Sequence, residues 1–144
     1  MRLRSITLLL FAAGCALTPE AKFAGEWQSP TNDLLEIRSD RTWTYTPTGG
    51  SAFAIGSNVQ FAGEWRREGE GFRLETQTIN GRAPAEAMAE FTRFARQFKD
   101  SDAMVKSIAN FSRPIKVELA SDGRTLMLTP PESPEAKRFA KREE

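Results

Sequence analysis

The residue best placed for chemistry is Cys15, because it is the only cysteine of the chain and supplies its only thiol. A short basic start, Met1 to Arg4, precedes a compact apolar run from Ile6 to Ala13. This order is typical of a secretory signal peptide. The apolar run is shorter than the ~20 residues that span a bilayer, so we expect a cleaved leader and no transmembrane anchor.

The end of this leader resembles the lipobox of bacterial lipoproteins, in which the cysteine thiol receives a diacylglyceryl group before cleavage. Ala13 and Gly14 fit that pattern, while Ala12 stands where leucine is usual. The resemblance implies a signal peptide at 1–14, a lipidated tether at 15–22, and acyl chains such as palmitate at Cys15. Ala16 is not acidic, which implies sorting to the outer membrane, facing the periplasm. The alternative is a plain secretory signal with an incidental cysteine.

Catalytic and metal chemistry find little support elsewhere in the chain. Histidine is absent, which removes the usual general base, metal ligand and pH switch. Glu26 and Glu64 each lie between glycine and tryptophan, and a carboxylate pair can hydrolyse glycosides. In an alternating strand, however, Glu64 points opposite to Trp65, and nothing in the sequence places the two carboxylates together. We expect no enzyme, no cofactor and no metal site.

Charge and length give a second set of limits. The chain has 20 basic and 19 acidic residues, and the leader takes Arg2 and Arg4 with it, so 18 basic residues remain in the mature part. This near-neutral balance gives no sign of a nucleic-acid partner. A single cysteine allows no internal disulfide bond. The length suits one domain with a hydrophobic core.

Alternation of apolar and polar residues predicts a series of short strands that bury one face each. In Thr42–Thr46, for example, both aromatic residues share one face and the threonines share the other. The pattern predicts a mainly β fold at 23–131, an antiparallel meander that closes to a small barrel or half-barrel. The expected strands are 23–27, 34–38, 42–46, 58–67, 72–79, 115–119 and 125–129.

The period changes to a helical one between the fifth and sixth of these strands. Pro84 suits a first helical position, and apolar residues then recur at helical spacing as far as Phe98. We expect a helical insertion at 84–110, interrupted near Asp100, before the last hairpin. The charged segment 132–144 is expected to be a C-terminal tail.

The pentapeptide Phe-Ala-Gly-Glu-Trp occurs twice, at 23–27 and 61–65. Each copy is followed by a polar turn and another apolar strand, which predicts two similar hairpins. Glycine in a strand allows a bulge or a close approach of the next strand, and the indole then covers the space. Core packing of both tryptophans and an indole-lined binding site are the two interpretations.

Gly25-Glu26-Trp27 resembles the Gly-x-Trp element of lipocalins, and the stretch 35–45 is similar to the second and third strands of bacterial lipocalin-like domains. The resemblance covers 23–79 and, loosely, 115–129. It implies an arginine from a late strand packed on Trp27 by a cation–π contact, for which Arg113 and Arg124 are the candidates. The insertion departs from the family pattern, in which a helix follows the last barrel strand.

Two functions follow as expectations. The first is a lipid-anchored envelope domain that binds a small apolar ligand or another envelope component without catalysis. Trp43, Tyr45, Trp65 and Phe72 would line the site and Phe53 and Ile55 would form its lid. Side chains of this size can also fill an eight-stranded barrel completely, which is the alternative.

The second function is a protein-interaction accessory subunit of an envelope complex, acting through the helical insertion. Phe94 lies off the main apolar stripe, and with Phe98 it could form an exposed partner surface. The alternative is an insertion that plugs the open end of the barrel. Arg93, Arg96, Lys99 and Lys106 suit either anionic headgroups or a solvated helix face.

Overall fold

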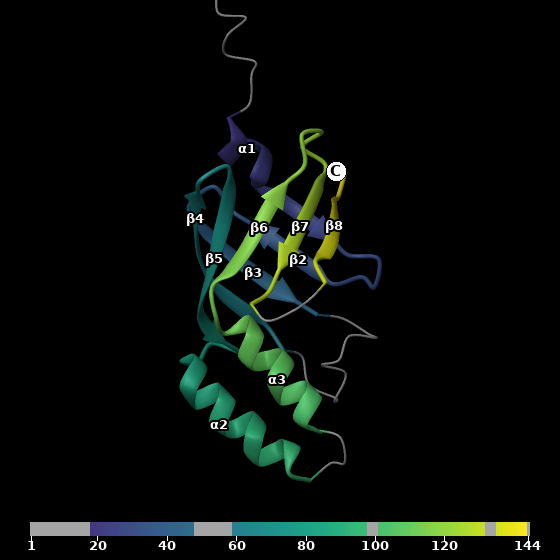
Figure 1. The fold of residues 1–144 in the computed structure, drawn as a ribbon. Coiled ribbons are helices and arrows are strands. Elements are labelled where there is room, and N and C mark those ends of the chain that lie inside the picture. Colours follow the sequence, from purple (N-terminus) through teal and green to yellow (C-terminus); the bar gives the residue numbers. More distant parts are fainter. Residues whose placement is uncertain (1–17, 48–58, 98–100, 132–134, 144) are drawn as a thin grey trace, which may run out of the picture.

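Eight strands form a closed antiparallel barrel in which each strand pairs with its neighbours in sequence and the last pairs with the first (Figure 1). This computed structural model describes residues 18–47, 59–97, 101–131 and 135–143. The strands are β1 (Gly25–Gln28), β2 (Leu34–Ile37), β3 (Thr42–Thr46), β4 (Phe61–Glu68), β5 (Gly71–Ile79), β6 (Ile115–Leu119), β7 (Thr125–Thr129) and β8 (Lys137–Lys141). The helices are α1 (Pro19–Phe23), α2 (Pro84–Ala95) and α3 (Ser101–Phe111).

Alternating burial along the strands builds the core inside the barrel. In β3, Trp43 and Tyr45 are buried while the three threonines are half-buried on the outer wall. The same alternation holds for the first five residues of β4 and the first four of β5. The predicted mainly β meander and its helical insertion between β5 and β6 are therefore confirmed, and the barrel is closed.

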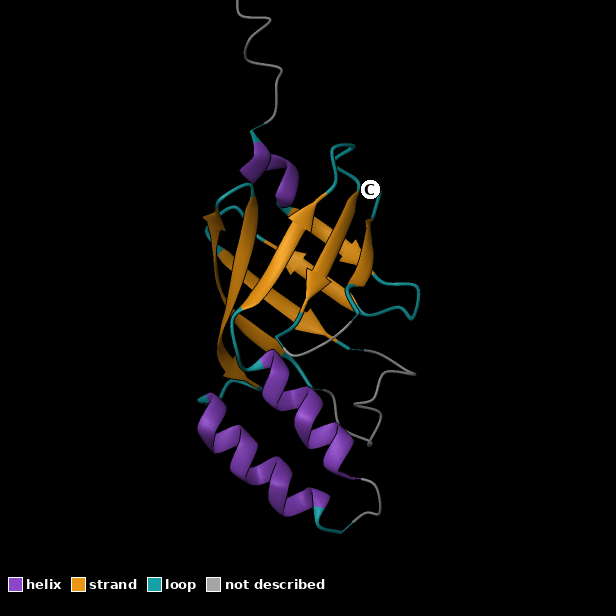
Figure 2. Cartoon of the chain, viewed as in Figure 1, coloured by secondary structure: helices purple, strands orange, loops and turns teal. Residues whose placement is uncertain are grey.

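Helices cover the two ends of the barrel, α1 at one end and the α2–α3 hairpin at the other (Figure 2). At the first end, Phe23 of α1 stacks on Phe72 with ring centroids 3.9 Å apart. At the second end, Phe111 of α3 stacks on Tyr45 at 4.9 Å. Aromatic contact thus ties the helix at each end to the core between them.

The expected charged tail at 132–144 is wrong in its central part, because Lys137–Lys141 form β8. This strand lies between β7 and β1 and carries Phe139 into the core, where it is fully buried. Phe139 is the only large apolar residue of β8, and three of the other four residues are charged, so the sequence shows no strand pattern. The count of strands is therefore eight where the sequence predicted seven.

The expected tether at 15–22 also ends earlier than predicted, since Pro19–Phe23 form α1. The Thr18 hydroxyl accepts a hydrogen bond from the amide of Ala21 and caps the helix, and Pro19 occupies its first turn. Phe23 belongs to this helix, and β1 begins only at Gly25.

Both glycines of the repeated pentapeptide lie where another chain segment comes close. At Gly63 the register of β4 on β5 shifts, and a Cβ atom would overlap the carbonyl oxygen of Glu75. At Gly25, where φ is +145°, a Cβ atom would lie 2.9 Å from Cε of Lys141. The predicted bulge and close strand approach are present at Gly63, whereas at Gly25 the neighbour is the end of a lysine side chain. The indoles of Trp27 and Trp65 are buried, as core packing requires.

The cation over Trp27 is Lys141, whose Nζ lies 5.2 Å from the ring centroid. The resemblance to lipocalins suggested Arg113 or Arg124 for this place. Arg124 instead reaches Glu143 at 3.6 Å, and Arg113 lies in the short connection between α3 and β6. The cation does come from a late strand, but this strand is β8, which the sequence pattern did not reveal.

We expect Gly63→Ala to lower the free energy of unfolding by about 2–4 kcal/mol, because its methyl group would displace the backbone of β5. Gly69→Ala is the matched control: nothing lies within 4 Å of its Cβ, so only its φ of +59° adds strain, about 1 kcal/mol. Urea unfolding followed by tryptophan fluorescence measures both losses. Equal losses in the two variants would show that β4 and β5 do not approach closely at Gly63.

Candidate functional site

The aromatic residues predicted to line a ligand site all lie inside the barrel, but they do not form one surface. Trp65 and Phe72 meet edge to face at 5.7 Å near α1. Tyr45 lies toward α3, in contact with Phe111. Phe53 and Ile55 lie outside the described residues. The proposed lining is therefore divided between the two ends of the barrel.

Aromatic rings are in contact with one another at both ends of the described barrel interior. Phe23 meets Trp65 edge on at 5.0 Å, and Phe61 lies 5.2 Å from Phe111. The predicted lining residues Trp43, Tyr45, Trp65 and Phe72 are each no more than 3% exposed. The described part of the barrel is thus a packed core of the kind that side chains of an eight-stranded barrel can form.

A buried polar cluster interrupts this core near α3. The Tyr45 hydroxyl donates a hydrogen bond of 2.8 Å to the carboxylate of Asp33, which is 1% exposed. The ammonium group of Lys137 lies 3.3 Å from the same hydroxyl and 3.9 Å from the same carboxylate oxygen. The cluster joins the β1–β2 loop to β3 and β8, and satisfies a carboxylate that would otherwise be costly to bury.

Burial, followed by the negative charge of Asp33, raises the pKa of Tyr45. The phenol therefore stays protonated and keeps donating to the carboxylate, a positioning role for the loop. Neither partner of Tyr45 follows from the sequence pattern. Asp33 lies in a turn-like segment, and Lys137 falls within the expected tail.

The two glutamates of the pentapeptides are far apart, as Glu26 lies on β1 and Glu64 on β4, with β2 and β3 between them. Glu26 instead lies opposite Glu36 of β2 in the strand register. Arg142 pairs with Glu26 at 3.1 Å, and Arg38 binds Glu36 through two hydrogen bonds. Each carboxylate thus has its own arginine.

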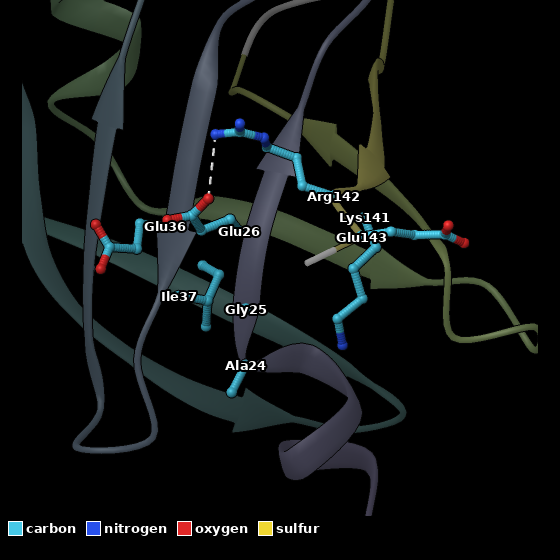
Figure 3. A pocket seen from close by; sticks show the side chains of 8 residues that line it. All are labelled: Ala24, Gly25, Glu26, Glu36, Ile37, Lys141, Arg142 and Glu143. Carbon is cyan, nitrogen blue, oxygen red and sulfur yellow. Dashed lines mark hydrogen bonds and ion pairs between the residues drawn. The ribbon is translucent and has the colours of Figure 1, made fainter.

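Figure 3 shows the hollow beside these two glutamates, where the Lys141 side chain turns toward Ala24. The hollow has a volume of about 480 Å³. The Lys141 ammonium donates a 2.9 Å hydrogen bond to the carbonyl of Lys22 in α1, and desolvation lowers its pKa. The Lys141 ammonium group therefore links α1 to the barrel.

A second hollow, of about 360 Å³, lies between α2 and the end of β5. Among the large apolar side chains of the described residues, Phe94 is the one that is exposed, at 41%. An ion pair of 2.6 Å between Arg82 and Glu90 crosses beside the groove. Phe98, the second predicted partner residue, lies outside the described residues. The groove is lined by Ile79, Asn80, Arg82, Ala87, Glu90, Phe91 and Phe94.

Comparisons with known proteins give no assignment, since no family model, curated protein or solved structure matches this chain. In the part of the chain that the structure describes, no helix is both long and apolar enough to cross a membrane. The same described residues contain no group of three or more acidic, cysteine or histidine side chains suited to a metal ion. The class that the geometry defines is a closed, packed antiparallel barrel with a helical hairpin at one end.

We expect Tyr45 to remain un-ionised in the folded protein above pH about 10, where an unfolded tyrosine titrates. A pKa raised on folding gives stability that is complete below that pH and is lost as the pH rises toward the folded value. Tyr45 is the only tyrosine, so the tyrosinate absorbance reports on it alone. The band should develop only as the protein unfolds in alkali, and should be absent from Tyr45→Phe. Ionisation near pH 10 in the folded state would contradict the buried contact with Asp33.

Proposed function

We propose that this protein is a lipid-anchored, non-catalytic envelope domain in which a lipocalin-like barrel carries a helical hairpin that binds another envelope protein. The observation behind this choice is the contrast between the two candidate surfaces. Aromatic rings occupy the described barrel interior, whereas the α2 groove presents Phe94 at its surface. Exposed apolar grooves on helices are typical of partner sites.

The hairpin is built so that α3 serves the core and α2 stays accessible. Ile108 and Phe111 of α3 are buried against the barrel end. Of α2, only the small residues Ala87 and Ala95 are buried, while Phe94 lines the groove and is 41% exposed. Figure 2 shows both helices beyond the end of the barrel.

The place of the lipid supports a partner in the periplasm. Cys15 precedes Thr18, the cap of α1, by three residues, which reach about 11 Å at most. The hairpin lies at the opposite end of the barrel from α1 (Figure 1). A lipid on Cys15 would therefore hold α1 close to the outer membrane and the hairpin away from it, so that Arg93 and Arg96 would face water and not headgroups.

A small apolar ligand inside the barrel is the less favoured proposal, because it would have to displace rings that are in contact. The stacked pairs Phe23–Phe72 and Tyr45–Phe111 would both open to admit it. Each buried aromatic ring contributes about 3–5 kcal/mol to folding, so such opening is costly. The lipocalin-like assignment rests on the closed barrel, the Gly-x-Trp strand and the Lys141 cation over Trp27.

We expect Phe94→Glu to remove the hairpin's cross-linked complexes from its native host, since a charge in the groove prevents apolar docking. Ala89→Glu is the matched control, because it adds the same charge to α2 at an exposed position outside the groove. In-cell cross-linking with quantitative immunoblotting compares both with the wild type. The urea midpoints of all three should agree. Unchanged complexes in Phe94→Glu would rule out the groove as the docking site.

We expect Cys15→Ser to move the protein from the membrane fraction to the soluble fraction, because it removes the only thiol that can carry the acyl chains. Incorporation of labelled palmitate in the host provides the direct measurement, with the wild type as control. If the serine variant keeps its label or its membrane association, the anchor is not a lipid on Cys15. This outcome would leave the hairpin proposal standing.

A further inference from the structure

A third hollow, of about 520 Å³, lies on the outer wall where β8 meets β1, apart from the α2 groove. Its walls come from the last residue of β1, the β1–β2 loop, and β8 with the residue that follows it. It is lined by Gln28, Ser29, Pro30, Asn32, Arg138, Ala140, Lys141 and Arg142.

The geometry of β8 places two arginines on one face of this hollow. Arg138, Ala140 and Arg142 alternate along the strand and are exposed, while Phe139 between them is buried. Four residues of extended chain separate the two arginine Cα atoms by about 13 Å. Ala140, between them, lies opposite Gln28 of β1 in the strand register. Its side chain is small, so it forms the floor of the hollow and leaves space above it. Both guanidinium groups can reach over this floor.

The charges of the hollow are one-sided. Among the described residues that line it there is no aspartate or glutamate. Arg142 reaches out of it to Glu26 at 3.1 Å (Figure 3), and the Lys141 ammonium is held by the carbonyl of Lys22. Arg138 is exposed, and no ion pair joins it to any described carboxylate. Of the two arginines in the hollow, Arg138 has no ion pair with a described carboxylate. Arg142 has one, with Glu26, which lies outside the hollow.

The structure assigns to this hollow the binding of a phosphate group, held between Arg138 and Arg142. Guanidinium forks donate several parallel hydrogen bonds, and a phosphate offers several acceptor oxygens to two such forks at once. Side-chain amides complete the wall: Gln28 donates a 3.1 Å hydrogen bond to Asn32, which fixes both beside the floor. The phosphate can belong to a phospholipid headgroup or to a soluble phosphate ester.

Glu26 acts as a competitor for this phosphate. It already lies opposite a second carboxylate, Glu36, across the strand register, an arrangement that is unfavourable on its own. Arg142 relieves that repulsion by pairing with Glu26. A bound phosphate must draw Arg142 away, so the loss of the Glu26 charge should strengthen binding. A merely structural role for Arg142 would not produce this gain.

The experiment titrates the exported full chain carrying Cys15→Ser with glycerol 3-phosphate and with inorganic phosphate, followed by amide chemical shifts at low salt. We expect shifts centred on Gln28, Asn32 and Ala140. Arg138→Gln should raise the dissociation constant about fivefold, the upper end for an exposed charge pair, and Glu26→Gln should lower it about twofold. Arg66→Gln, which removes an exposed arginine on β4, is the matched control and should leave it unchanged.

A second arm sediments the same proteins with phosphatidylcholine vesicles, with and without phosphatidylglycerol. Binding to the soluble esters without a preference for the anionic vesicles would identify a soluble ligand. Binding to the anionic vesicles that depends on Arg138 would identify a headgroup. The proposal is overturned if neither probe binds, or if Arg66→Gln weakens binding as much as Arg138→Gln does. None of these outcomes bears on the α2 groove.

Discussion

The fold depends on the closure of the barrel by β8. This short strand pairs with β7 on one side and β1 on the other, and supplies Phe139 to the core. Its last residue, Lys141, crosses Gly25 to cover Trp27 and binds the carbonyl of Lys22. The strand that closes the barrel therefore also fastens α1 over one end. Without it, Trp27 would face water and the helix would lose its hydrogen bond to the barrel.

The filled interior has a consequence for function. One group of contacting rings lies at the α1 end, around Phe23, and a second lies at the α3 end, around Phe111. A closely packed core of this kind resists deformation, so it positions outer surfaces accurately but offers no room without rearrangement. Both proposals therefore place recognition on the outside of the barrel, at the α2 groove at one end and at the hollow beside β8 on its wall.

The sequence predicted the elements whose pattern is local and missed those that depend on distant partners. Strands such as Thr42–Thr46 and the exposed Phe94 follow from alternation and helical spacing alone. In β8, a single inward Phe139 among charges gives no periodic signal. The cluster of Asp33, Tyr45 and Lys137 joins residues 12 and 92 positions apart, which no local pattern reports. An arginine over Trp27 was expected, whereas the cation there is Lys141, on the strand that the sequence pattern missed.

The proposed phosphate hollow and the closure of the barrel meet at the same place. β1 and β8 share only two register pairs, Trp27 with Lys141 and Gln28 with Ala140, fewer than any other neighbouring strands of the described barrel. The hollow is walled by both strands. A ligand held by Arg138 and Arg142 against Gln28 would therefore bind only the closed form, and by mass action would stabilise it. An anion bound beside this shortest strand pairing would thus raise the stability of the closed barrel.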